Sequence, residues 1–244
     1  MHSLMSIYNA TNGPHWSLRH QWGNMSVSPC VWFGVCCDAD ASLILQGQLQ
    51  SNLEHENQFP TCSLSRRPPY CCATTGSNVT LLQLNGNNLQ GILPDAIGQL
   101  TSLQLLDLSY NVIRGTFPVA LLNLTKLRDL RLAGNRLTGS LPQNIGDLHR
   151  LQFFSLSKNK VTGTLPDSMG AWEELRTLLL AQNMFTGGLP ATMEQCRNLT
   201  SLDVADNPLN SEFPSWIVKL PALSVLGFRS TGMRGPLPTN IGVL

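Results

Sequence analysis

Leucines recur at short, fixed intervals over the last two thirds of the chain, in the order L-x-x-L-x-L-x-x-N-x-L-x-G-x-L-P. Because alternate residues of a strand point to opposite faces, the L-x-L core predicts a short strand whose leucines face inward. The glycine and proline that follow indicate a bend, since glycine tolerates unusual backbone angles and proline fixes one. The tail of each unit, such as "DAIGQL", predicts a short helical turn. One copy contains Leu127, Leu130, Leu132, Asn135, Leu137, Gly139, Leu141 and Pro142.

The whole pattern returns every 24 residues. Prolines keep this step at Pro94, Pro118, Pro142, Pro166, Pro190, Pro214 and Pro238. Asparagines keep it at Asn87, Asn111, Asn135, Asn159, Asn183 and Asn207, and the next step reaches Thr231. Self-similarity at a fixed period predicts a solenoid, because a single unit buries too little apolar surface to offset its loss of conformational entropy. Stacked units cover one another's apolar edges and share backbone hydrogen bonds.

The recurrent asparagine stands where each predicted strand ends and the chain turns inward. Its amide can donate to and accept from backbone groups that no strand ladder reaches. A catalytic group has no reason to recur in every coil, so we interpret the column as a structural ladder. Thr231 replaces one amide with a hydroxyl and should perform less of this role.

The repeat resembles the plant-type leucine-rich repeat, and seven copies cover Val79 to Leu244. This resemblance implies an α/β leucine-rich repeat solenoid, with short parallel β-strands on a concave face and 3-10 or short helical turns on the convex face. Residues 78–244 would form the repeat domain. Proteins similar in this way are extracellular recognition modules: receptor ectodomains, adhesion proteins and inhibitors of secreted enzymes.

The stretch "CVWFGVCCD" resembles the C-x-W-x-G-V-x-C motif in the N-terminal cap of such proteins. The resemblance implies a disulfide cap over residues 1–38, in which Cys30 pairs with Cys37. Trp16 and Trp22 would pack as the core of this cap, because the open apolar end of a solenoid must be covered.

An insertion at 39–77 departs from the family pattern. One interpretation is a loop tied by disulfides, in which Cys62, Cys71 and Cys72 pair with Cys36 or one another. The other is a zinc site that uses thiolates and His55, which the absence of a C-x-x-C motif disfavours. We therefore expect no metal and no cofactor. Cys196 stands alone at a leucine position of the repeat and should be a free buried thiol.

Composition narrows the setting of the chain. Charged residues make up 13% of the 244 residues and the net charge is +1, which argues against nucleic-acid binding. No apolar stretch approaches the length of a membrane span, so membrane contact would need a segment missing from this chain. The N-terminus lacks the pattern of a secretory signal. Six cysteines clustered before residue 73 nevertheless indicate an oxidising compartment, so we expect an extracellular or cell-surface location and a longer parent protein. Five glycosylation sequons begin at Asn9, Asn24, Asn78, Asn123 and Asn198.

No catalytic motif is present, and the sequence therefore predicts a non-enzymatic recognition module that binds a protein, peptide or glycan. Two alternatives stay open: the ligand-sensing ectodomain of a receptor kinase, and a soluble inhibitor of a secreted hydrolase. Ligand contacts should come from outward strand residues on the concave face, some of them apolar without a packing reason. The predicted set is Leu81, Leu105, Asp107, Tyr110, Arg131, Phe153, Lys158 and Leu179. Asp107, Asp129 and Arg131 could instead simply pair with one another, with little energetic consequence.

Overall fold

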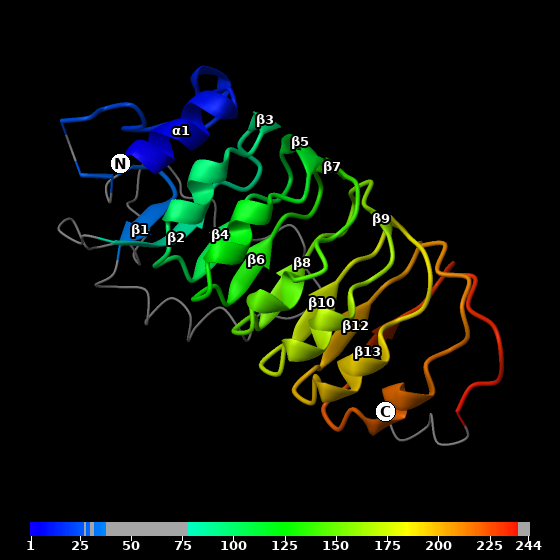
Figure 1. The fold of residues 1–244 in the computed structure, drawn as a ribbon. Helices are drawn as coiled ribbons and strands as arrows, with labels where there is room; N and C mark the ends of the chain where they lie inside the picture. The colour runs from blue at the N-terminus through cyan, green and yellow to red at the C-terminus, as the bar shows by residue number, and fades with distance from the viewer. Residues whose placement is uncertain (27, 30–31, 38–77, 239–244) are drawn as a thin grey trace.

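The structure is a computed structural model and describes residues 1–26, 28–29, 32–37 and 78–238. Successive coils stack side by side and form the predicted solenoid (Figure 1). One face is a sheet in the order β1-β2-β4-β6-β8-β10-β12-β13. Its strands are β1 (Val35–Cys37), β2 (Val79–Gln83), β4 (Leu105–Asp107), β6 (Asp129–Arg131), β8 (Phe153–Ser155), β10 (Thr177–Leu179), β12 (Ser201–Asp203) and β13 (Val225–Gly227).

The strands from β2 to β13 are parallel, and each residue pairs with the residue one repeat further on, as Leu106 does with Leu130. The exact register follows from the period of 24, because any shift would turn the inward leucines outward. β1 is the exception and runs antiparallel to β2, with Cys36 opposite Leu81.

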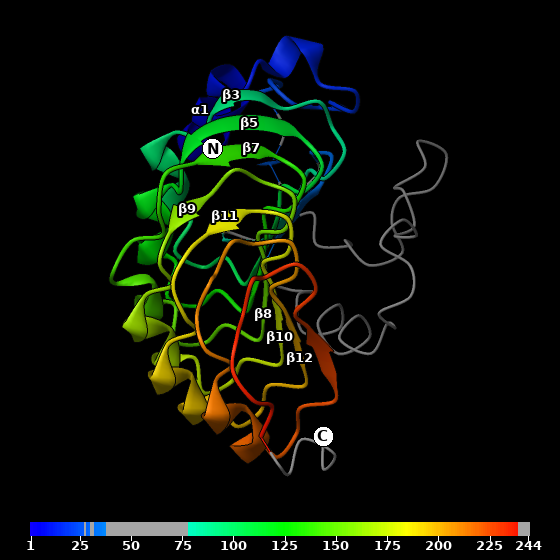
Figure 2. The same cartoon turned by 90° about the vertical axis from the view of Figure 1, so that its right-hand side faces the viewer.

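Two other sides complete each coil (Figure 2). A second sheet contains β3 (Gln90–Ile92), β5 (Val112–Thr116) and β7 (Arg136–Thr138), and β9 (Thr162–Gly163) pairs with β11 (Met184–Phe185). The convex side carries the 3-10 helices η3 (Asp95–Gln99), η4 (Val119–Asn123), η5 (Ile145–Asp147), η6 (Asp167–Ala171), η7 (Ala191–Gln195) and η8 (Ser215–Lys219). The predicted fold class is therefore confirmed.

The inward leucines of all coils form one continuous core that runs from the cap to Leu223. Large aromatic side chains fill it where a coil offers more room, as where Phe154 meets Trp172 with ring centroids 5.4 Å apart. Because the core is continuous, each coil depends on both neighbours for the burial of its edges.

The cap contains α1 (His2–Ala10) and η1 (Gly13–His15). Trp16 and Trp22 are buried, as predicted, with ring centroids 4.8 Å apart, and Trp22 also contacts Trp32 at 5.0 Å. The indole Nε1 atoms of Trp16 and Trp22 donate to the carbonyls of Thr11 and Phe33, at 2.9 and 2.8 Å. These bonds let two large rings seal the apolar end without leaving their N–H groups unpaired.

Cys36 and Cys37 are both disulfide-bonded. Cys30 and the insertion at 39–77, with Cys62, Cys71, Cys72 and His55, lie outside the described residues. The Cys30–Cys37 pair and the connectivity of the insertion therefore stay predictions.

The recurrent asparagines form the expected ladder. The Oδ1 atom of Asn159 accepts from Leu137 N at 3.0 Å, in the preceding coil. Its Nδ2 atom donates to Leu132 O in that coil and to Leu156 O in its own coil, both at 3.0 Å. Corresponding bonds hold Asn111, Asn135, Asn183 and Asn207.

Thr231 departs from this geometry as predicted. Its hydroxyl donates to Phe228 O at 2.9 Å, within its own coil. In the preceding coil, Leu209 N donates to Asn207 O instead of to a side chain at position 231. The last described coil is therefore joined less firmly to its neighbour.

Replacing Asn159 with alanine should destabilise the protein strongly. Asn159→Ala leaves Leu137 N–H without its acceptor, and an unsatisfied buried group costs about 1–3 kcal/mol. It also removes one of the two amide donors of Leu132 O and of Leu156 O, which keep their bonds from Asn135 and Asn183. We expect a loss of about 2–4 kcal/mol in unfolding free energy, measured by chemical denaturation. Thr231→Ala is the matched control and should lose about 1 kcal/mol, because it removes a single bond within one coil. Equal losses from both changes would contradict the ladder.

Cys196 is a free, buried thiol, as predicted. Burial, with a smaller effect from Glu173, raises the pKa of Cys196 to about 11. Because the thiolate is the reactive form, iodoacetamide at pH 8 should alkylate folded protein about a hundredfold more slowly than unfolded protein. Mass spectrometry after a timed alkylation pulse, with and without denaturant, measures this ratio. Fast alkylation of the folded chain would show that the thiol is exposed.

Candidate ligand-binding face

The outward residues of the main sheet form three columns, because every strand presents alternate side chains to the concave face. Neighbouring strands lie about 4.8 Å apart, so side chains one repeat apart are adjacent. At the N-terminal end of the concave face, Leu81 and Leu105 are buried. In the rest of the described concave face, the stacking of coils depends on no outward leucine. Its central part, on β4, β6 and β8, carries the densest group of polar and aromatic side chains.

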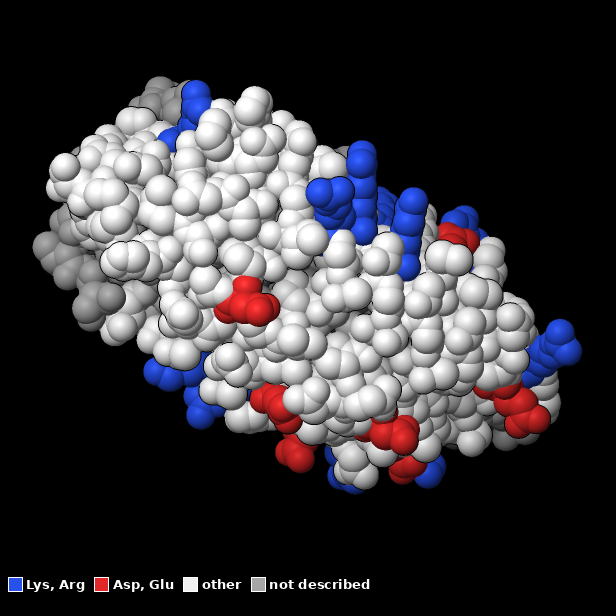
Figure 3. Space-filling view, turned by 45° about the horizontal axis from the view of Figure 1, so that its top comes forward, with Lys and Arg blue, Asp and Glu red and all other residues white. Residues whose placement is uncertain are grey.

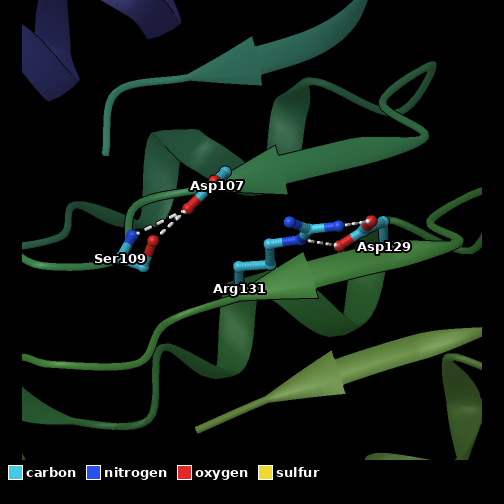
Figure 4. A network of polar contacts seen from close by, with 4 residues as sticks. All are labelled: Asp107, Ser109, Asp129 and Arg131. Carbon is cyan, nitrogen blue, oxygen red and sulfur yellow. Dashed lines mark hydrogen bonds and ion pairs between the residues drawn. The ribbon is translucent and has the colours of Figure 1, made fainter. Parts of the chain in front are cut away.

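A network of four residues lies on β4, β6 and the turn after β4 (Figure 4). The Arg131 guanidinium binds the Asp129 carboxylate with two bonds, from Nε to Oδ1 and from Nη2 to Oδ2, each 2.8 Å long. Asp107 Oδ1 accepts from the backbone N and the Oγ of Ser109, at 3.0 and 2.5 Å. The alternative that Asp129 and Arg131 pair is thus correct, and the pair holds the guanidinium in one fixed plane.

Phe153 extends the network onto β8. The Arg131 Cζ atom lies 4.4 Å from the centre of the Phe153 ring. Asp129 and Phe153 are directly paired residues of neighbouring strands, so carboxylate, guanidinium and ring form one layer. A cation held over an aromatic face by a carboxylate presents a preorganised surface with both apolar and charged parts.

Burial changes the acid–base properties of this network. Asp107 is 2% exposed, and burial raises the pKa of its carboxyl above the ordinary value although Ser109 and Arg131 oppose the shift. Burial lowers the pKa of Arg131, but the charge and hydrogen bonds of Asp129 outweigh it and the pKa lies above its ordinary value. The site thus combines a guanidinium whose charge Asp129 stabilises with a carboxyl whose pKa burial raises.

Tyr110 and Lys158 lie at the edge of the face, after the strand ends of two different coils. Both have left-handed backbone angles, with φ of 55° and 57°, and the Lys158 Nζ atom lies 5.9 Å from the Tyr110 ring centre. Between them in the repeat stands Gly134, where an added Cβ would approach the Tyr110 ring to 2.7 Å. Glycine here lets the tyrosine lie flat across the coil.

The structure corrects two of the predicted contact residues. Leu81 and Leu105 are 2% and 3% exposed, not open apolar residues, and they form a separate small cluster with Cys36. The pairing of β1 with β2 explains this burial, because it places Cys36 beside Leu81 on the concave side. Leu179 is half-buried on β10.

Of the predicted set, Asp107, Arg131 and Phe153 are brought together, Tyr110 and Lys158 flank them, and Leu179 lies on the next strand. The sequence did not single out Ser109 as a partner of Asp107. A signal was present, because D-L-S at 107–109 and D-L-R at 129–131 stand in consecutive coils, two repeat positions apart. Residues two apart on a strand share a face and can pair.

Several alternatives to recognition find no support among the described residues. They contain no group of three histidine, cysteine or acidic side chains placed to hold a metal ion. Within the same ranges, no helix has both the length and the apolar character that a membrane crossing needs. The sequon residues Asn9, Asn24, Asn78, Asn123 and Asn198 are exposed, and Asn123 ends η4, away from the concave sheet. Their glycosylation stays a prediction.

Three family models, all described as leucine-rich repeats, match the chain at residues 77–137, 150–172 and 195–212. A chain built of such coils, with a parallel sheet on one face and 3-10 helices on the other, is a leucine-rich repeat solenoid. Its repeats are of the plant type, as the resemblance implied. The comparison with curated proteins gives no match.

Solved structures with the same fold include ectodomains of plant receptors and a plant ice-binding protein. The PEPR1–AtPEP1 structure is 32% identical with a TM-score of 0.66, and the match covers 68% of this chain and 23% of that chain. The Arabidopsis receptor kinase HAESA, in complex with the peptide hormone IDA and the co-receptor SERK1, is 27% identical with a TM-score of 0.74 and coverages of 99% and 36%. The LRR ectodomain of the receptor kinase SOBIR1 from Arabidopsis thaliana is 27% identical with a TM-score of 0.61 and coverages of 85% and 92%. The chain spans about a quarter to a third of the first two of these proteins.

Asp107 should make folding stability depend on pH. Its pKa is raised in the folded state, so its contribution is fully present below pH 3.8 and is lost as the pH rises through the folded-state value. Asp107→Asn stays neutral, and its melting temperature relative to the unsubstituted protein should therefore rise between pH 3 and pH 7. Melting curves by circular dichroism at both pH values test this.

Asp206→Asn provides a control of opposite sign. The hydrogen bond from Arg229 lowers the pKa of Asp206, so its contribution is present above pH 3.8 and is lost as the pH falls. The relative stability of this variant should therefore fall between pH 3 and pH 7. The same trend in both variants would show that Asp107 does not titrate as described.

Proposed function

We propose that this chain is a non-enzymatic, extracellular recognition module that binds a peptide segment on its concave face. The observation that carries the proposal is the layer of Asp129, Arg131 and Phe153, flanked by Asp107 and Tyr110. These side chains lie on a face that the coils do not use for stacking. A fixed arginine, an aromatic ring and hydrogen-bonding groups are the side chains that anchor protein and peptide interfaces.

Two further observations support a peptide ligand. The network alternates charged and aromatic groups along neighbouring strands, which suits a chain with alternating polar and apolar side chains. HAESA, which shares the fold at 27% identity, is a receptor kinase in complex with a peptide hormone. This likeness favours a chain that is part of a cell-surface receptor, with the described coils in its ectodomain.

The carboxylates and the arginine act here as binding groups. Asp129 is committed to Arg131, and Asp107 accepts two bonds from Ser109. The Ser109 hydroxyl and the Asp107 carboxylate are both buried, so this pair is poorly placed to act on a ligand at the surface as a nucleophile and its general base would. The ligand should therefore leave the face chemically unchanged.

The test is a selection of peptides from a random display library on immobilised protein, followed by calorimetry on the enriched peptides. Phe153→Ala should weaken the binding of such a peptide at least tenfold, about 1.4 kcal/mol, because it removes the ring and the surface on which Arg131 rests. Tyr110→Ala should weaken binding less, since Tyr110 lies at the edge.

Gln143→Ala is the matched control, an exposed residue on the way from β7 to η5. It should leave both affinity and melting temperature unchanged. Full binding by Phe153→Ala, together with loss of binding in Gln143→Ala, would place the ligand on the convex side and refute the proposal.

A further inference from the structure

The outer face of the second sheet is a surface that the concave site does not use. Ile113 and Leu137 are buried, whereas Arg114, Arg136 and Thr138 beside them are exposed. Short parallel strands of successive coils lie side by side along this surface (Figures 1 and 2).

Three cations form what we call the basic strip: Arg114, Arg136 and Lys160. Arg114 and Arg136 are direct partners on β5 and β7. Lys160 lies opposite Thr138, since Lys160 N donates to Leu137 O at 2.8 Å and Thr162 N donates to Gly139 O at 2.7 Å. The strip therefore crosses three successive coils within about 10 Å. Basic side chains gather at this edge of the solenoid in Figure 3.

The strip places like charges side by side. Like charges directly opposite one another destabilise a sheet. Further along the same side, the chain instead sets Glu212 opposite Arg234. Elsewhere it pairs Lys219 with Glu194 at 3.0 Å. Among the described outward residues of this sheet from position 88 to 188, none is acidic. The strip thus carries a positive charge that its own sheet does not compensate.

The surroundings of the strip are hydroxyl groups. Thr116, Thr138 and Ser140 are exposed beside the cations, and Thr164 and Thr186 continue the row. The exposed large apolar residues of this sheet, Ile92 and Met184, stand at its two ends, 58% and 53% exposed. A protein partner would need apolar or aromatic anchors at the centre. An acidic polysaccharide, by contrast, needs protein cations to bind its acid groups and protein hydroxyls to bind its hydroxyl groups.

The geometry points to the basic strip as a binding site for a linear anionic polysaccharide, carboxylated or sulfated. Each arginine offers a planar fork of donors that fits a carboxylate or a sulfate. A ligand with one acid group binds such exposed cations weakly. A polymer contacts all three at once, and a contact that breaks forms again quickly because the other contacts hold the polymer in place. This site is separate from the concave face, so the protein could hold a matrix polymer and a peptide at once.

The test uses surface-immobilised protein and three soluble polysaccharides: alginate, which is carboxylated, heparin, which is sulfated, and neutral dextran. Poly-glutamate and duplex DNA serve as anionic polymers that are not polysaccharides. Alginate, heparin or both should bind and dextran should not, and binding should weaken steadily as salt rises from 50 to 300 mM. Arg114→Glu combined with Arg136→Glu should reduce binding at least tenfold. The change in circular dichroism and in melting temperature should be small, because both side chains are exposed.

Lys126→Glu combined with Arg128→Glu is the control of equal charge, on two exposed residues between η4 and β6. It should retain binding within about twofold, as should Phe153→Ala, which separates the strip from the concave site. An equal loss of polysaccharide binding in both double variants would show that binding depends on net charge and not on the basic strip. Equal or tighter binding of poly-glutamate or of duplex DNA would overturn the assignment to a polysaccharide.

Discussion

The bond between each recurrent asparagine and the neighbouring coil is the interaction on which the structure depends. The chain turns inward after every strand, and at that turn the backbone leaves the ladder that would satisfy it. One amide per coil supplies the missing donors and acceptor: Asn159 donates to Leu132 O and Leu156 O and accepts from Leu137 N. These bonds join each coil to its neighbour at every turn, and they support the register that the period of 24 sets.

This regularity explains why a functional surface can be displayed at low structural cost. The inward leucines and the amides hold the coil, so the repeat does not dictate which residue types stand at most outward positions. The network of Asp107, Asp129 and Arg131 uses that freedom to bury charged groups on a surface, which is tolerated because the carboxylates accept several bonds each. The basic strip uses it differently and keeps its charges in solvent.

The fold was predictable because its determinants are local and repeated. The period of 24 predicts the register of the parallel strands β2 to β13 in the main sheet, and Thr231 indicates the weak place in the ladder. The site was predictable only in part. Alternation placed Asp107, Arg131 and Phe153 on one face, but it gave no hint that Leu81 and Leu105 would be covered, because β1 returns antiparallel from a segment outside the repeat. The strip was missed because Arg114 does not share the repeat position of Arg136 and Lys160, and only the 22-residue register of the second sheet makes Arg114 the partner of Arg136.

The spacing of the concave columns also sets a ruler for any extended ligand. Strands stand about 4.8 Å apart, whereas an extended peptide advances about 3.3 Å per residue, so three peptide residues match about two coils. Successive side chains of the ligand therefore do not fall on successive coils. A ligand side chain returns to an equivalent position of the solenoid only about every third residue. The four strands from Asp107 to Leu179 measure about 14 Å, the length of four or five extended residues. This face can therefore recognise only a segment of four or five residues of an extended ligand. The rest of such a ligand would be free to bind other partners.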